Sequence, residues 1–315
     1  MKDYGQLLLT IMPVFVLIAL GARLRRGGWL SGEAERGLVW FQVNLLYPSL
    51  ILENVLGSAA LREPGNLLWA PLAGFITTAG GMGLSYYAGR LLGLTTGGGL
   101  RTFGLSSGIY NYAFVPIPII TSLWGSGSLG VLLVHNVGAE VAVWTLGILL
   151  LSGLSLREGW RKLINPTVVC LLLSLALNLS GLDSTVPEFL RKTVGMVAAC
   201  AIPFGLLLSG TALGSCLDQL RELIHLRTQL GAVALRLGLL PVAFLLLAKY
   251  LPCPLELKRV IVVQGAMPSG MISLWLATYY GGHQLTAARV VVATTLAGLI
   301  TIPLWLSFGL RFVGV

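Results

Sequence analysis

The sequence predicts an all-α polytopic membrane protein whose ten transmembrane helices form two inverted five-helix repeats. Three observations support this fold class. First, 56% of the 315 residues are hydrophobic and only 10% are charged, whereas an ordinary soluble domain has about 25% charged residues. Second, apolar stretches of membrane-spanning length recur along the whole chain. Third, prolines recur at nearly the same spacing in the two halves. With a mean hydropathy of +0.85, too few polar side chains remain to cover a soluble fold, so lipid must face much of the surface.

The apolar stretches fix the expected spans, because about 20 residues of helix cross the roughly 30 Å hydrocarbon core of a bilayer. The connections between them carry charged and turn residues, and none is long enough to hold a soluble domain. The ten expected spans, numbered 1 to 10 in chain order, are residues 7–22, 37–56, 67–91, 101–124, 128–151, 166–182, 194–214, 229–250, 260–280 and 286–312.

The distribution of basic residues predicts the orientation. If the N-terminus lies on one side of the membrane, that side holds eight Lys and Arg residues and the opposite side twelve, with Arg236 inside a span. Cytoplasmic loops carry the excess of basic residues. We therefore expect an integral protein of the plasma (inner) membrane with both termini outside the cytoplasm.

The formal net charge of +9 does not indicate nucleic-acid binding, since the basic residues lie in short clusters between apolar stretches. The four cysteines form no CxxC pair and have no histidine at ligand spacing, so no metal site and no cofactor are expected. The chain also has no HExxH and no GxSxG motif. These features argue against an enzyme.

The prolines indicate an internal repeat. Pro13 and Pro166 near the starts of spans 1 and 6 are 153 residues apart, and Pro48 and Pro203 in spans 2 and 7 are 155 residues apart. Five spans separate the copies, an odd number, so the second copy must be inverted relative to the first. We place the first repeat at residues 1–156 and the second at residues 157–315.

Spans 4 and 9 contain polar, proline-bearing sequences that interrupt a helix. Span 4 reads Ser107 to Pro118 as SGIYNYAFVPIP, and span 9 reads Gln264 to Gly270 as QGAMPSG. Both breaks fall near the midplane and the two spans run in opposite directions, so we expect them to cross. Free backbone groups and the positive ends of half-helices would then face one point and could hold an anion without a buried Lys or Arg.

The crossing is therefore the predicted substrate site. The alternative is that the prolines only kink helices whose free backbone groups are satisfied by neighbouring helices. The residues expected to contact substrate are Tyr110, Asn111, Tyr112, Pro116, Gln264, Met267, Pro268 and Ser269.

Two ionisable residues lie inside spans, where such residues are rare and usually functional. Glu140 and Arg236 are both expected near mid-membrane, where they could pair. One interpretation is a proton or substrate relay with His135 and Asn136, and the other is a structural ion pair. The sequence leaves both open.

The same regions resemble the auxin efflux carrier family, and the resemblance covers essentially the whole chain. The residues that carry it are Tyr110 to Pro118 followed by Leu123-Trp124-Gly125, Asn136 through Trp144 to Gly147, Ile164-Asn165-Pro166, Met267-Pro268, and Ile302 to Trp305. Each motif is short, but their order and spacing are specific.

The resemblance implies a ten-helix inverted-repeat fold like that of the bile-acid sodium symporters. It also implies a scaffold of spans 1, 2, 6 and 7, a moving domain of spans 3–5 and 8–10 that works as an elevator, and a homodimer. Plant relatives export auxin, an indole carboxylate, and bacterial relatives are associated with dicarboxylates such as malate or malonate. Span 3 lacks the Asp and Lys that some relatives carry, so their energy coupling is not carried over.

We therefore expect a secondary transporter (permease) of small organic anions, carboxylates in particular, and not an enzyme. Its partners would be membrane lipids and a coupling ion, either protons or sodium. One alternative is a sodium-coupled organic-anion symporter on the same fold, which needs a cluster of oxygen ligands beside the crossing. Another is a membrane sensor that binds a solute without moving it, although the chain has no soluble output domain.

Overall fold

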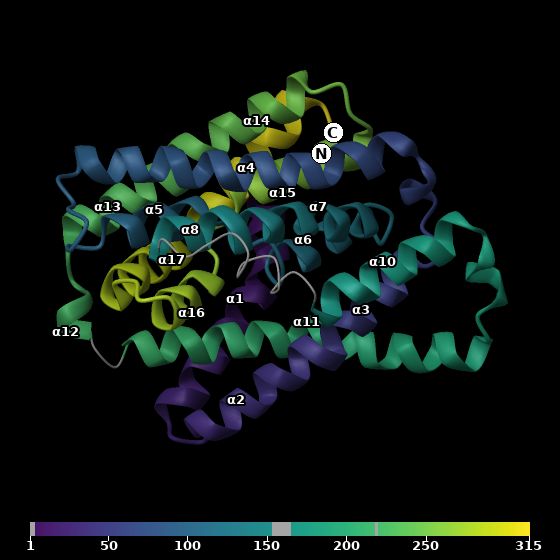
Figure 1. Cartoon of the computed structure of the whole chain (residues 1–315), viewed down its shortest axis with the longest axis horizontal. Coiled ribbons are helices and arrows are strands. Elements are labelled where there is room, and N and C mark those ends of the chain that lie inside the picture. Colours follow the sequence, from purple (N-terminus) through teal and green to yellow (C-terminus); the bar gives the residue numbers. More distant parts are fainter. Residues whose placement is uncertain (1–3, 153–164, 218–219) are drawn as a thin grey trace.

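The computed structural model describes residues 4–152, 165–217 and 220–315, and the regular structure within these residues is helical (Figure 1). The boundary expected between the two repeats, at residues 156 and 157, lies outside the described residues, as do Arg157, Arg161 and Lys162. The first-half elements are α1 (Tyr4–Arg26), α2 (Gly32–Phe41), η1 (Gln42–Leu46), α3 (Tyr47–Val55), η2 (Ala59–Arg62), α4 (Pro64–Leu91), α5 (Leu100–Gly108), α6 (Pro116–Trp124), α7 (Leu129–Ala142), η3 (Val143–Gly147) and α8 (Ile148–Ser152).

Within the described residues, the second half runs from a shorter apolar helix to a long one. Its elements are α10 (Pro166–Leu179), η4 (Leu182–Thr185), α11 (Glu188–Leu217), α12 (Leu220–Leu223), α13 (Leu226–Ala234), η5 (Leu235–Leu239), α14 (Leu240–Tyr250), α15 (Leu255–Ala266), α16 (Ile272–Tyr279) and α17 (Gln284–Val313). The elements η1, η3 and η5 are single turns of π-helix inside longer helices.

Among the described residues, six helices are long and apolar enough to cross a membrane, and they coincide with expected spans 1, 3, 5, 7, 8 and 10. The other four expected spans consist of shorter pieces. Span 2 is α2, η1 and α3, span 4 is α5 and α6, span 6 is α10, and span 9 is α15 and α16. The helical class is thus confirmed, with spans 4 and 9 interrupted where the sequence predicted.

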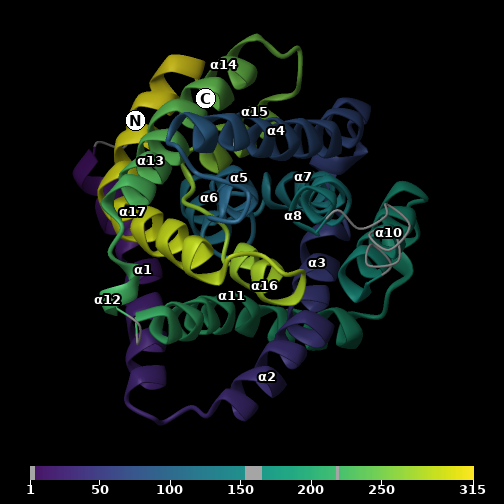
Figure 2. The ribbon, with the colours of Figure 1, turned by 60° about the vertical axis from the view of Figure 1, so that its left-hand side comes forward.

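Glycines bring two pairs of helices into backbone contact. A Cβ atom at Gly21 of α1 would collide with the carbonyl oxygen of Leu207 on α11, and one at Gly138 of α7 would collide with the carbonyl oxygen of Pro71 on α4. Small residues permit such close approach between membrane helices. Figures 1 and 2 both show α2 and α11 along the lower edge and α4 and α14 along the upper edge.

Contacts between connections define two ends of the molecule. At one end, Arg25 in the last turn of α1 donates to Ser215 near the end of α11, and Arg289 near the start of α17 donates to the carbonyl of Glu222 in α12. At the other end, Arg62 of η2 pairs with Asp183 of η4 at 3.0 Å. The last turn of α1 and the first turns of α17 thus lie at the same end of the molecule. The start of α1 and the last turn of α17 therefore lie together at the opposite end.

A proline and a tryptophan explain the π-helical turn η5. Pro241 has no N–H, so the carbonyl of Leu237, four residues earlier, loses its helical partner. The indole Nε1–H of Trp305 on α17 donates to that carbonyl at 2.5 Å. The widened turn carries Arg236, which is fully buried.

Candidate functional site

Both helix breaks lie where the prolines and polar residues predicted them. The first break follows Gly108 and ends at Pro116, which opens α6 as its first residue. The second follows Ala266, includes Met267, Pro268 and Ser269, and ends before α16. All of these residues are buried.

The two breaks pair with each other in the manner of a short antiparallel ladder. Tyr110 and Ser269 form an isolated β-bridge. The Asn111 amide donates to the Pro268 carbonyl at 2.7 Å, and the Gly270 amide donates to the Ile109 carbonyl at 2.9 Å. A Cβ at Gly270 would lie 2.8 Å from the carbonyl oxygen of Tyr110, so this close approach requires glycine.

This pairing corrects one sequence expectation. We expected the backbone groups freed at the breaks to face a common point, but four of them bind one another across the crossing. The Ser269 amide is also engaged, since it donates to the hydroxyl of Thr294 on α17 at 3.2 Å. Buried backbone groups need partners, and each break supplies them to the other. The ligand-binding capacity of the crossing therefore rests mainly on its side chains.

Tyr110 fixes the first break to the neighbouring helices. Its hydroxyl lies 3.0 Å from the hydroxyl of Thr77 and 3.3 Å from that of Thr78, both on α4. Its ring packs edge to face against Tyr112, with centroids 6.2 Å apart, and lies 6.2 Å from the ring of His135. Both ring nitrogens of His135 are buried and make no hydrogen bond to any described residue.

Asn111 lies between these two tyrosines in the first break, outside the neighbouring helices α5 and α6. It is 6% exposed, and its side-chain amide makes no hydrogen bond within the described residues. It can offer a donor and an acceptor to a solute.

Gln264 and Asn136 join the crossing to α7. The Gln264 amide nitrogen donates to the Asn136 side-chain oxygen at 3.0 Å and to the carbonyl of Tyr112 at 3.2 Å. The remaining Gln264 oxygen and Asn136 nitrogen are buried and have no partner among the described residues. These two amides therefore retain one unused acceptor and one unused donor.

Arg236, on η5, contacts the Tyr110 ring and lies near the carboxyl end of α15. Its guanidinium carbon is 5.4 Å from the centroid of the Tyr110 ring and 5.3 Å from that of Phe244. One nitrogen donates to the Gly265 carbonyl at 3.2 Å, whereas Nε and Nη1 have no partner in the described part of the chain. The negative end of a helix favours a cation. Two nitrogens of Arg236 nevertheless have no hydrogen-bond partner in the described part of the chain.

The expected pair between Glu140 and Arg236 is not formed in the structure: the ion pairs among the described residues do not include it. Glu140 instead accepts a hydrogen bond from the side chain of Asn165, which precedes α10. Its carboxylate also lies within electrostatic reach of the hydroxyls of Tyr47 and Tyr112. The two buried charges therefore have different neighbours.

Sequence reasoning missed a contact between α3, α11 and the first break. Phe114 packs edge to face on Tyr47 at 5.8 Å, and its ring fills the space that a Cβ at Gly205 would occupy. The only available signal was indirect, since Tyr47 precedes Pro48 and Gly205 follows Pro203 at related positions in the two halves.

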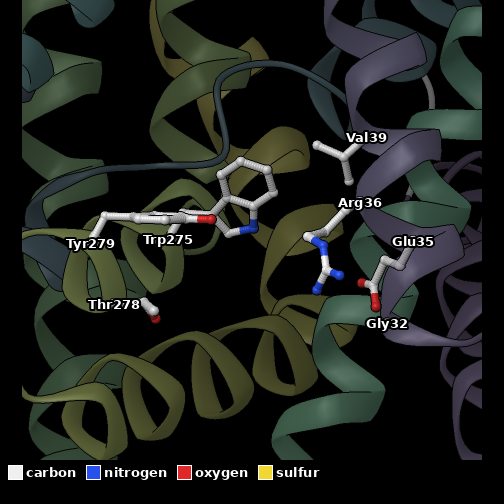
Figure 3. A pocket seen from close by; sticks show the side chains of 7 residues that line it. All are labelled: Gly32, Glu35, Arg36, Val39, Trp275, Thr278 and Tyr279. Carbon is white, nitrogen blue, oxygen red and sulfur yellow. The ribbon is translucent and has the colours of Figure 1, made fainter.

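A cavity of about 200 Å³ lies between α2 and α16 (Figure 3). The lining includes Arg36 and Glu35 from α2 and Trp275 and Tyr279 from α16. In Figure 3 the Arg36 side chain extends from α2 into the space between α2 and Trp275. Since α16 starts at the second break, this cavity lies between α2 and the half-helix that leads away from the crossing.

Comparison with known proteins gives a family match. The model of a family described as membrane transport protein matches residues 7–158 and, a second time, residues 153–306. An uncharacterized transporter of Methanothermobacter thermautotrophicus is 27% identical over 307 residues, which cover 94% of this chain and 96% of that protein. An uncharacterized transporter of Methanocaldococcus jannaschii is 22% identical, with 94% and 96% covered. The resemblance to auxin efflux carriers is thereby confirmed.

Proposed function

Because the chain belongs to the membrane transport protein family, we propose that it is a secondary transporter that carries small organic anions, carboxylates in particular. In this proposal the chain crosses the membrane ten times as two inverted five-helix repeats. The two separate matches of the family model to the two halves support this layout, as do the two paired breaks at repeat-related positions.

The observation that carries the proposal is a buried side-chain amide without a hydrogen bond to any described residue, at the crossing of two broken helices and next in sequence to a tyrosine whose ring contacts a buried cation. The Asn111 side chain makes no hydrogen bond within the described residues, and the Arg236 guanidinium, two of whose nitrogens have no partner there, contacts the ring of the adjacent residue Tyr110. The amino-terminal ends of α6 and α16 also begin at the crossing and favour negative charge. A carboxylate would meet hydrogen-bond donors and positive potential together.

Two groups of helices supply the parts of an elevator. In the first group α11 packs on α1 and α3, and α10 packs on α3. In the second group α4 packs on α5 and α7, and α15 packs on α14 and α17, while α1 and α17 pack on each other between the groups. We propose that the second group carries the crossing past the first. The cavity between α2 and α16 would then open one side of the path, and the contact of Phe114 with Tyr47 and Gly205 would close the other.

The test is binding and uptake of carboxylates by Asn111→Leu. The change removes both polar functions of Asn111, so we expect affinity to fall by about 1.5–3 kcal/mol, the scale of a hydrogen bond to a charged group. That is a roughly ten- to hundredfold loss. A thermal-shift screen of the purified wild type with acetate, malonate, malate and indole-3-acetate identifies the ligand, and proteoliposome uptake then measures its transport.

A matched control is Asn44→Leu on η1. The amide of Asn44 donates only within its own helix, to the Trp40 carbonyl at 2.8 Å, so this variant should transport nearly normally. If a well-folded Asn111→Leu protein binds and carries the anion as the wild type does, the solute site lies elsewhere. Uptake that requires sodium at every pH would favour the sodium-coupled alternative, for which the buried Gln264 oxygen offers one ligand.

A further inference from the structure

The Glu140 carboxyl occupies a boundary between helices that the proposed mechanism must separate. Glu140 lies on α7, whereas the Asn165 amide that binds it precedes α10 and Tyr47 opens α3. The Oε2 atom is enclosed and makes no hydrogen bond to a described residue, although the residue as a whole is partly exposed. The carboxyl thus keeps one oxygen that could bind a proton.

Asn165 is oriented to bind the ionised form of this carboxyl. Its side-chain oxygen accepts the Val168 amide at 3.0 Å and caps α10. That bond leaves the amide nitrogen to donate to Glu140. An N–H donor stabilises a carboxylate more than a carboxylic acid, since a charge-assisted hydrogen bond is stronger than a neutral one. Loss of the charge on Glu140 would therefore weaken a bond that joins α7 to α10.

The charges around the crossing balance only when Glu140 is ionised. Arg236 contacts the Tyr110 ring, the Tyr110 ring contacts the Tyr112 ring, and Glu140 lies within electrostatic reach of the Tyr112 hydroxyl. One positive and one negative charge thus flank the two tyrosines. An arriving carboxylate adds a second negative charge, and a proton on Glu140 restores the balance.

We propose that Glu140 takes up one proton from solution when a carboxylate binds at the crossing, so that anion and proton move together. This inference rests on the proposed function. The proton adds to a carboxylate oxygen of Glu140 and leaves to solution on the other side of the membrane, and no other bond forms or breaks. Uptake of the proton weakens the bond to Asn165 and frees α7 to move with the loaded crossing.

The groups facing Glu140 fit this assignment. From α3 the facing group is the Tyr47 hydroxyl, from the first break the Tyr112 hydroxyl, and from the start of α10 the uncharged Asn165 amide. His135 lies one turn earlier on α7 and contacts the Tyr110 ring instead. Of the basic residues, Arg62 is paired with Asp183, and Arg259 lies over the Trp124 ring. Glu140 is therefore the carboxyl in place to accept the proton.

The first measurement is the pH dependence of anion binding by purified wild type and Glu140→Gln, with acetate, malonate, malate and indole-3-acetate as probes. If each anion brings one proton, binding to the wild type must depend on pH wherever Glu140 is ionised in the unliganded protein. In that range the anion affinity should fall by about tenfold for each unit by which the pH rises. Glu140→Gln should bind with an affinity that does not change over this range. Glu53→Gln, at an exposed carboxyl on α3, should keep the wild-type slope.

The second measurement follows protons directly. Proteoliposomes with a pH dye inside should show proton movement with the anion for wild type and Glu53→Gln, and anion movement without protons for Glu140→Gln. An unchanged pH slope in folded Glu140→Gln would overturn the coupling while leaving the Asn111 site intact. If none of the four anions binds, both proposals fail. Infrared difference spectra recorded without any anion provide a separate check. A carboxyl band that titrates in the wild type must disappear in Glu140→Gln. The absence of such a band in the wild type would also refute proton uptake by Glu140.

Discussion

The substitution Arg236→Met tests whether the buried charge selects anions. Methionine approximates the length of the arginine stem but removes the charge and all N–H donors. Nε and Nη1 of Arg236 have no partner among the described residues, so the substitution removes only one hydrogen bond and two ring contacts. In return, the variant no longer buries a charge. Replacing buried ionic groups by apolar side chains of similar volume is often neutral or stabilising, so the variant should fold.

The expected loss follows from the position of the guanidinium. It lies 5.4 Å from the Tyr110 ring centroid, with the crossing beyond that ring. A carboxylate seated against Asn111 at a distance of roughly 8–10 Å would gain about 1.5–2 kcal/mol at an effective dielectric constant of about 20. Arg236→Met should therefore weaken anion binding by roughly ten- to thirtyfold.

The assay is calorimetric binding of malonate, or of whichever carboxylate binds the wild type, with the uncharged amide of the same acid as control. The amide has nearly the same shape but no charge, so Arg236→Met should change its affinity much less than it changes the affinity of the anion. Arg236→Lys keeps the charge and should retain most of the anion affinity. Undiminished anion binding by folded Arg236→Met would refute the electrostatic argument.

Three further predictions concern the crossing, the packing and the orientation. Gly270→Ala places a Cβ against a backbone oxygen of the first break and should cost about 1–3 kcal/mol of stability, whereas Gly298→Ala meets only ordinary contacts at 3.4 Å or more; thermal unfolding compares the two. Gly138→Ala forces α7 away from α4 and should greatly lower folded yield, while Gly80→Ala, with open space around it, should not. A cysteine at Val313 should react with impermeant reagents from outside the cell, and labelling from the cytoplasm alone would reverse the topology.

The class of protein and the two helix breaks could be predicted from the sequence, because both depend on local properties. Hydrophobicity over about 20 residues determines where a span can lie, and a proline removes one N–H whatever surrounds it. The crossing was also within reach, since the depth of Asn111 and Pro268 follows from about 1.5 Å of rise per residue. The same reasoning selected the side chains that gather there.

The partners of the buried charges depended on the tertiary structure. Depth along a span places Glu140 and Arg236 at similar heights, but the direction in which each side chain points turns by about 100° per residue around a helix. Helix rotation and packing, set by contacts such as that of Gly138 with α4, direct Glu140 toward Asn165 and Arg236 toward Tyr110. A single span contains no information about that rotation, so the sequence determined which charges are buried and the fold decided what each of them faces.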